Sequence, residues 1–110
     1  MTEKEKMLAG EIYDANYDEQ LIAERLAAQD LCHDYNLLKP SDLEGRQALI
    51  DRLGIKHGAN CVFQQPFICD YGYNISVGEG CVIGARSIVN KDIPAHHLAV
   101  GNPCRPIRKI

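Results

Sequence analysis

Residues 71–93 read YGYNISVGEGCVIGARSIVNKDI, and this stretch repeats with a period of six. A bulky residue followed by Gly or Asn recurs at every sixth position, in Tyr71-Gly72, Val77-Gly78, Ile83-Gly84 and Val89-Asn90. A second, smaller class of residue recurs with the same period, at Ile75, Cys81, Ser87 and Ile93. A hexapeptide repeat of this kind predicts a left-handed parallel β-helix.

The repeat has a physical reason. Each turn of a β-helix has three flat faces joined by tight corners, so inward positions need apolar side chains and corners need Gly or Asn, which tolerate positive φ. Three hexapeptides make one turn, and residues 71–93 supply little more than one turn, whereas a solenoid needs about three stacked units. An ordinary β-meander with glycine turns is the alternative. We therefore expect a truncated β-helix that the rest of the chain must cover.

The first half of the chain predicts three short helices within residues 2–54. Thr2 and Glu5 have the spacing of a capping box, and Gly10 ends the first helix. The second helix is expected over residues 18–35. Its apolar side consists of Leu21, Ile22, Leu26, Leu31, Cys32 and Tyr35.

The third helix is expected between Pro40 and Gly54. Ser41 and Glu44 have the spacing of a second capping box. The apolar stripe of this helix consists of Leu43, Leu49, Ile50 and Leu53. A helix with one apolar stripe needs a partner surface, which the predicted strands supply.

The composition changes at Ile55, where glycines, β-branched residues and aromatics replace the Leu, Ala, Glu and Arg of the helices. We therefore predict an α+β fold with two parts. Residues 1–54 form a helical N-terminal domain, and residues 55–110 form a truncated hexapeptide β-helix with a basic C-terminal tail.

Twelve basic and fifteen acidic residues give a formal charge of -3, which argues against a general nucleic-acid binder. No signal-peptide core and no run of roughly 20 apolar residues is present, so we expect a cytoplasmic protein. The cysteines form no Cys-x-x-Cys pair, and we expect reduced, mostly buried thiols rather than disulfides or a metal site. They are Cys32, Cys61, Cys69, Cys81 and Cys104.

Four further segments accompany the predicted helices. They are Cys69-Asp70-Tyr71-Gly72-Tyr73-Asn74-Ile75, Val82-Ile83-Gly84-Ala85, Asn90-Lys91-Asp92-Ile93-Pro94 and Ala99-Val100-Gly101-Asn102-Pro103-Cys104-Arg105. In this order they resemble the maltose and galactoside O-acetyltransferases, over nearly the whole chain. The resemblance implies transfer of an acetyl group from acetyl-CoA to a hydroxyl of a small sugar, by a homotrimer with sites at its subunit interfaces.

The same resemblance implies a missing segment between Gly80 and Cys81. Members of the family continue at this point with further coils and with the loop that carries the catalytic His. The join keeps the six-residue phase, since Val77, Ile83 and Val89 stay equally spaced, so the remaining strands can still stack in register. No residue of this chain is therefore assigned as the family's catalytic His.

Four histidines remain in the chain. The reaction that the resemblance implies needs a base for the proton of the sugar hydroxyl, and a near-neutral imidazole suits that task. We expect surface or capping roles for His33 and His57. The pair His96-His97 lies in a loop that could approach the CoA pantetheine arm. A role of this pair as a substitute for the catalytic base is therefore an open alternative.

Two aspartates match positions that face the acceptor sugar in the family. Asp14 matches an acidic residue that hydrogen-bonds the sugar, and a carboxylate can accept from two hydroxyls at once. Asp70 occupies a position where a polar residue also faces the acceptor. A helix N-cap or a solvated turn is an equal alternative for Asp14.

Five residues match family positions that contact the cofactor: Ala85, Asn90, Lys91, Arg105 and Arg108. Guanidinium groups suit phosphate oxygens because they donate paired hydrogen bonds, and a lysine adds a point charge. A solvated basic tail is the alternative for the arginines. Pro106 also departs from the small apolar residue that is usual in the family.

Two functions follow from these observations. The first is an acetyl-CoA-dependent sugar O-acetyltransferase, impaired because the segment with the catalytic His is missing. The second is a non-catalytic remnant that oligomerises, binds CoA, or does both without turnover. With so few coils, we also expect a marginal domain whose folding depends on association through exposed strand edges.

Overall fold

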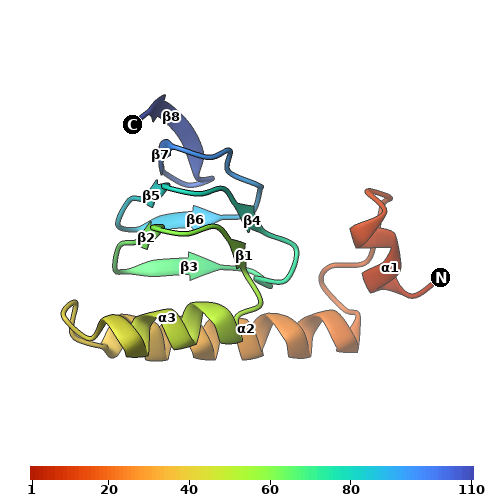
Figure 1. Ribbon diagram of the computed structural model, residues 1–110. Coiled ribbons are helices and arrows are strands. Elements are labelled where there is room, and N and C mark those ends of the chain that lie inside the picture. The colour runs from red at the N-terminus through yellow and green to blue at the C-terminus, as the bar shows by residue number, and fades with distance from the viewer.

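The computed structural model describes residues 1–110, in which three helices precede eight short strands (Figure 1). The helices are α1 (Glu3–Leu8), α2 (Glu19–Leu37) and α3 (Leu43–Arg52). The strands are β1 (Lys56–His57), β2 (Val62–Phe63), β3 (Phe67–Cys69), β4 (Ser76–Val77), β5 (Val82–Ile83), β6 (Ser87–Val89), β7 (His97–Val100) and β8 (Arg105–Lys109). None of the helices has the length and apolar character needed to cross a membrane.

The helix starts follow local side-chain chemistry. The predicted capping box of α1 is confirmed, because Thr2 accepts from the Glu5 N–H and the Glu5 side chain accepts from the Thr2 N–H. The predicted box between Ser41 and Glu44 is wrong. Asp42 is the N-cap of α3, and its Oδ1 accepts the Gly45 N–H at 3.0 Å. A carboxylate is the better acceptor at the positive end of a helix dipole, so the cap lies one residue later than expected.

The buried side of α2 is narrower than the sequence predicted. Its buried residues are Leu21, Ala28, Cys32 and Tyr35. Their spacings of seven, four and three positions define one stripe. Leu26 lies off this stripe and is 56% exposed, so its assignment to the apolar side is wrong. The small Ala28 lies on the stripe instead, where it allows close packing.

The first six strands form three parallel pairs. β1 pairs with β4, β2 with β5, and β3 with β6, and each pair joins residues twenty positions apart, as in Lys56↔Ser76 and Phe67↔Ser87. The chain therefore visits the three sheets in the same order twice. A β-meander would pair successive strands antiparallel, so that alternative is wrong for this part of the chain.

The last two strands close the stack. β7 pairs in parallel with β5, and β8 pairs antiparallel with β7 at the edge of the sheet. The result is a small helical region with short mixed sheets, in agreement with the α+β prediction at this level. The division into residues 1–54 and 55–110 stays a prediction, since buried residues of the helices and strands form one continuous cluster.

The six-residue repeat marks the residues that point inward. All eight residues at the two repeated positions are buried, with exposures between 0% and 8%. They are Tyr71, Val77, Ile83 and Val89 of the bulky class, and Ile75, Cys81, Ser87 and Ile93 of the smaller class. The prediction that these positions form the core is therefore confirmed.

Side chains of the helices complete the hydrogen bonding of the first strands. The Asn36 amide of α2 donates to the Phe67 carbonyl at 3.0 Å and accepts the Phe67 N–H at 2.8 Å, as a neighbouring strand would. Tyr35 and Arg46 donate to the carbonyl of Phe63 in β2. Figure 1 shows α2 and α3 side by side beneath the strands, where this outer edge lies. The helices therefore satisfy backbone groups that would otherwise be left unpaired.

We expect the Asn36→Ala substitution to reduce the free energy of unfolding by about 1–3 kcal/mol, because it leaves the N–H and C=O of buried Phe67 without partners. Urea denaturation followed by circular dichroism measures this loss. Gln29→Ala, at an exposed position of the same helix, is the control and is expected to change stability by less than about 0.5 kcal/mol. Equal midpoints for Asn36→Ala and the wild type would contradict the edge-capping role.

Candidate functional site

A cavity of about 210 Å³ lies where the N-terminal segment meets the ends of β3 and β6. Its walls consist of Met7, Tyr13, Asp70, Tyr71, Asn74, Ile75, Val89 and Asn90. This set contains one predicted acceptor contact, Asp70, and one predicted cofactor contact, Asn90. We call it the Asp70 cavity.

Strand register brings Asp70 and Asn90 together. Cys69 and Val89 are partners in the parallel ladder of β3 and β6, and the two polar residues follow them directly. Successive side chains in a strand point to opposite faces, so buried Cys69 and Val89 are each followed by an exposed polar residue. The pairing thus carries two side chains that lie twenty positions apart to one edge.

Asp14 does not line the Asp70 cavity, although its neighbour Tyr13 does. The exposed Asp14 carboxylate accepts the Tyr17 N–H through Oδ1 at 3.2 Å, and the Asp14 N–H donates to Glu3 Oε1 at 3.0 Å. These contacts match the turn that was the alternative for this residue. A role of Asp14 toward the acceptor stays a prediction.

A polar network holds the N-terminal segment that supplies this wall. Lys4 Nζ lies 2.9 Å from Glu24 Oε1 and 4.3 Å from the centre of the Tyr73 ring, and the Tyr73 hydroxyl donates to Glu24 Oε2 at 2.8 Å. Arg25 donates to the Ala15 carbonyl and, at 3.0 Å, to the Tyr71 hydroxyl. These bonds tie α1 and the following loop to α2 and to the strand region.

The network shifts the ionisation of its members. Burial acts to raise the pKa of Glu24, but the hydrogen bonds from Lys4 and Tyr73 outweigh it and leave this pKa below the ordinary value. Burial and the Glu24 carboxylate raise the pKa of Tyr73, because both oppose a phenolate there. Glu24 is therefore the charged acceptor, and Tyr73 the neutral donor, at neutral pH.

The predicted cofactor residues lie at several corners rather than in one cavity. Ala85 lines a separate hollow of about 360 Å³ with Arg46, Gln64 and Gln65 among its walls. Gly84, beside Ala85, donates its N–H to the Ala99 carbonyl at 2.8 Å. The next residue, Val100, is the ladder partner of Arg105.

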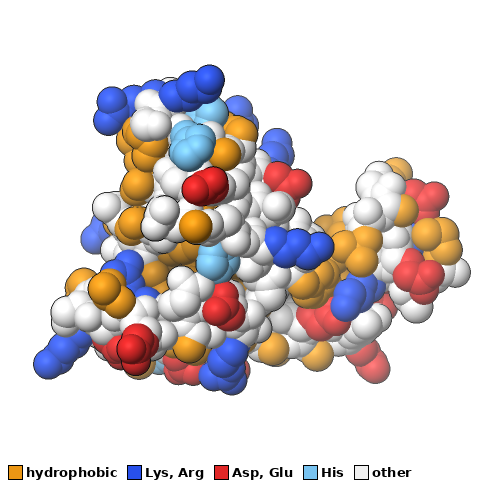
Figure 2. Space-filling view, viewed as in Figure 1, with side chains coloured by type: hydrophobic (Ala, Val, Ile, Leu, Met, Phe, Trp, Pro, Cys, Tyr) orange, Lys and Arg blue, Asp and Glu red, His pale blue; other side chains and the backbone are white.

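The remaining basic residues are exposed. Lys91 follows Asn90 at the end of β6, and Arg108 pairs with Leu98 in the β7–β8 ladder. Figure 2 shows Lys and Arg side chains gathered at the β8 end of the molecule, where Arg105, Arg108 and Lys109 lie in an exposed strand. A patch of this charge suits phosphate groups.

No histidine is among the residues that line the Asp70 cavity. His33 is exposed on α2, and His57 Nε2 lies 2.9 Å from Asp51 Oδ1, which lowers the pKa of that carboxyl. His96 donates its backbone N–H to the Glu79 carbonyl at 2.7 Å, and His97 Nδ1 lies 2.8 Å from the Ala95 carbonyl. His96 thus lies at the corner that precedes β7, and His97 is the first residue of that strand.

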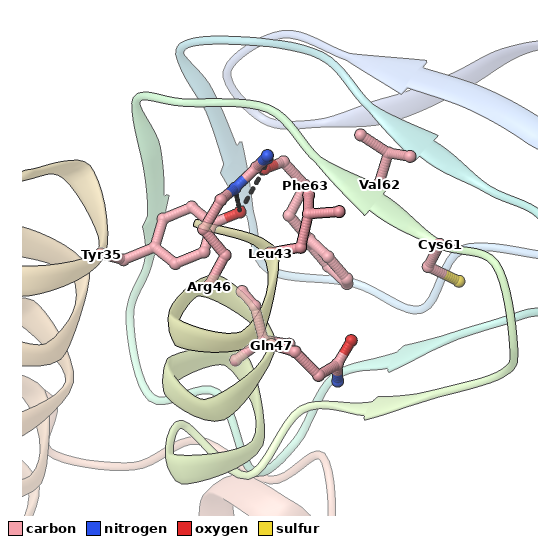
Figure 3. Close-up of a pocket in the computed structure, with 8 residues that line it drawn as sticks. Tyr35, Leu43, Arg46, Gln47, Cys61, Val62 and Phe63 are labelled. Atoms are coloured by element: carbon pink, nitrogen blue, oxygen red, sulfur yellow. Dashed lines mark hydrogen bonds between the residues drawn. The ribbon is translucent and has the colours of Figure 1, made fainter. Parts of the chain in front are cut away.

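Arg46 is a half-buried anchor that sequence reasoning missed. It lies beside a hollow of about 150 Å³ between α3 and β2, together with Tyr35 and Phe63 (Figure 3). Its guanidinium donates to the Phe63 carbonyl at 2.9 Å, the Pro40 carbonyl at 2.8 Å and the Tyr35 hydroxyl at 3.3 Å. Burial raises the pKa of Tyr35, against the opposite effect of Arg46. Because Nε, Nη1 and Nη2 each already donate to an oxygen of the protein, Arg46 positions α3 rather than a ligand.

Known proteins resemble this chain in both sequence and fold. The family model described as the maltose acetyltransferase hexapeptide capping motif matches residues 6–53. A Staphylococcus aureus (strain Mu50) protein named as an acetyltransferase is 34% identical, over the whole of this chain and 92% of its own length. The structure of a maltose O-acetyltransferase from Clostridium difficile 630 superposes with a TM-score of 0.59 and 29% identity, over 100% of this chain and 98% of that one.

A galactoside acetyltransferase solved in complex with coenzyme A has a TM-score of 0.60 and 23% identity, over 100% of this chain and 92% of that one. At this identity the likeness concerns the fold. Together these matches define a hexapeptide-repeat acetyltransferase. The chain belongs to the family of the maltose and galactoside O-acetyltransferases.

The alignment also locates a difference in length inside the chain. It spans 184 positions with the S. aureus protein, whereas this chain has 110 residues, so at least 74 positions of the relative have no counterpart. Because the alignment covers the whole chain, these unmatched positions are internal. The sequence predicts the join between Gly80 and Cys81.

The Glu24 network is expected to lose strength in acid. A carboxyl whose pKa is lowered by folding stabilises the folded state fully above its unfolded pKa of about 4.3, and this contribution is lost as the pH falls through the folded value. Thermal unfolding of the wild type should therefore show a larger fall in Tm between pH 6 and pH 3 than Glu24→Gln.

The control for this comparison is Glu44→Gln, at an exposed position of α3, which should keep the pH dependence of the wild type. If the Tm of Glu24→Gln falls between pH 6 and pH 3 by as much as that of the wild type, the ionised Glu24 carboxylate does not contribute to the stability.

Proposed function

We propose that this chain is an acetyl-CoA-dependent O-acetyltransferase for a hydroxyl of a small sugar of the maltose, glucose or galactoside class, with impaired turnover. The observation that carries the proposal is the Asp70 cavity, which an acidic side chain just after β3 and an amide just after β6 line together in a member of this family. We further propose that the chain, as it passes through the three sheets in turn, forms a left-handed β-helix, the sense that hexapeptide repeats favour.

Asp70 is the proposed acceptor contact. Its carboxylate can accept hydrogen bonds from two sugar hydroxyls, and Asn74 adds an amide that both donates and accepts. Tyr13 brings the Asp14 segment to the same wall, which supports Asp14 as a second contact through its remaining carboxylate oxygen. The sequence did not indicate Asn74 or Tyr13 for this role.

The proposed reaction forms an ester bond. The sugar oxygen attacks the thioester carbonyl carbon of acetyl-CoA, its proton passes to a base, and the tetrahedral oxyanion collapses with loss of CoA as thiolate. Among the cavity side chains only Asp70 is a carboxylate, and no imidazole lines the cavity to take this proton. Loss of a positioned base typically costs about 10²- to 10⁴-fold in rate, which is the basis for proposing impairment.

CoA is the proposed co-substrate. Arg105, Arg108 and Lys91 would meet its phosphates, while Ala85 would contact the rest of the cofactor beside β5 and Asn90 would contact it at the end of β6. The exposed basic strand β8 supports this orientation, and solved relatives of the same fold carry coenzyme A or acetyl-CoA. The proposed chemistry needs no metal ion.

A second candidate is the non-catalytic remnant that binds CoA, oligomerises, or does both. The observation that favours it is that no histidine lines the Asp70 cavity, since His96 precedes β7 and His97 begins it. β8 is an exposed edge strand of five residues, which suits pairing with another copy of the chain. A homotrimer remains the proposed assembly.

Turnover distinguishes the two candidates. With acetyl-CoA and maltose, glucose or a galactoside, we expect thiol release about 10²- to 10⁴-fold below that of the C. difficile maltose O-acetyltransferase. Asp70→Asn should lower the rate further, and the His96→Ala/His97→Ala double variant should leave it unchanged. Turnover that is lost in the double variant would instead assign the base to this pair, and release at the background rate in every sample would favour the remnant.

CoA binding tests the basic strand independently of turnover. We expect the Arg105→Ala/Arg108→Ala double variant to bind CoA about tenfold more weakly by calorimetry, because two charge-assisted contacts to phosphate are removed. Lys39→Ala, an exposed cation at the end of α2, should bind like the wild type. Equal affinities for the double variant and the control would show that β8 is only a solvated basic tail.

A further inference from the structure

Two cysteines from different parts of the chain touch in the core. Cys32 of α2 and Cys69 of β3 are 37 positions apart in sequence, and their Sγ atoms are 3.8 Å apart. Both are free thiols and both are buried, with exposures of 3% and 1%. The sequence predicted them as separate buried thiols, because nothing in their spacing indicates contact.

Of the two cysteines, only Cys32 lines a hollow at the surface. Cys32 lines a hollow of about 310 Å³ together with Gln29, His33, Asn36 and Ile68. Gln29, His33 and Ile68 are exposed, so the hollow opens to solvent on the outer side of α2. A reactant the size of a few water molecules can therefore approach Cys32, while Cys69 lies behind it.

The contact also shifts the pKa values of the two thiols in opposite directions. The hydrogen bond between the two sulfurs, in which either thiol can be the donor, lowers the pKa of Cys32. The same bond and burial raise the pKa of Cys69. The thiolate is the reactive form of cysteine, so Cys32, the sulfur on the hollow, is also the one that ionises first.

We propose that Cys32 and Cys69 form a redox site that a peroxide converts to a disulfide between α2 and β3. The Cys32 thiolate attacks one peroxide oxygen, the O–O bond breaks, and a sulfenic acid and hydroxide form. The Cys69 sulfur then attacks the Cys32 sulfur, its proton leaves with the displaced hydroxide as water, and the S–S bond forms. Two thiols are oxidised by two electrons, and hydrogen peroxide is reduced to two molecules of water.

The movement that this step requires is small. The sulfurs must approach by roughly 1.8 Å to reach a bond length of about 2.0 Å, which rotation of the two side chains can share. In the reducing compartment that the sequence predicts, such a pair is reduced at rest and oxidised only transiently. The disulfide would tie α2 to the strand whose edge this helix covers, and it acts independently of acetyl transfer.

Peroxide treatment of the folded full chain tests the proposal. After titration with hydrogen peroxide, we expect the number of free thiols to fall from five to three, and peptide mapping without reductant to find Cys32 linked to Cys69. The Tm should rise by about 5 °C or more and return on reduction, because the crosslink restricts the unfolded chain. Cys104→Ser, at another buried cysteine that is not part of the pair, should behave like the wild type.

Cys69→Ser should remove both the crosslink and the rise in Tm, and leave Cys32 as a sulfenic acid that dimedone traps. Since a serine in the core can weaken the fold, the peptide map of the wild type decides by itself. A map in which Cys32 and Cys69 stay unlinked, or in which either is linked to Cys61, Cys81 or Cys104, would overturn the proposal. A link that forms only in urea would overturn it as well.

Discussion

The packing of α2 and α3 against the outer edge of the first strands is the constraint on which the rest of the structure depends. Strands β1, β2 and β3 have a parallel partner on one side only. Their other side would expose apolar residues and unpaired backbone groups to water, which is costly in a chain with so few strands. The Asn36 amide and the donors of Tyr35 and Arg46 satisfy this edge, and one continuous apolar cluster joins helices and strands.

The same packing sets the geometry of the candidate site. Because α2 is fixed beneath β3, the Glu24 network can hold α1 and the following loop against the end of that strand. The parallel register of β3 and β6 then places Asp70 beside Asn90. A cavity with an acceptor-type carboxylate thus results from backbone pairing, while the two arginines that could bind phosphate lie on the edge strand β8.

Most features of short range could be predicted from the sequence. The period of six predicted the inward residues, and the spacing of Thr2 and Glu5 predicted the first helix cap, because both features depend on neighbours within a few positions. The prediction was wrong for Ser41, where a stronger acceptor one residue later takes the cap, and for Leu26, which lies off the narrow buried stripe. In both cases a local pattern was compatible with two answers, and packing selected one.

The sequence by itself determined the helices, the inward repeat positions and the family, because periodicity and motif order are properties of the chain. Tertiary structure alone decided which distant side chains meet. It brought Asp70 to Asn90, Cys32 to Cys69 and Asn36 to the backbone of Phe67, and it left the histidines elsewhere. These contacts depend on how many residues each coil contains and on where the helices dock, and no spacing along the sequence encodes either quantity.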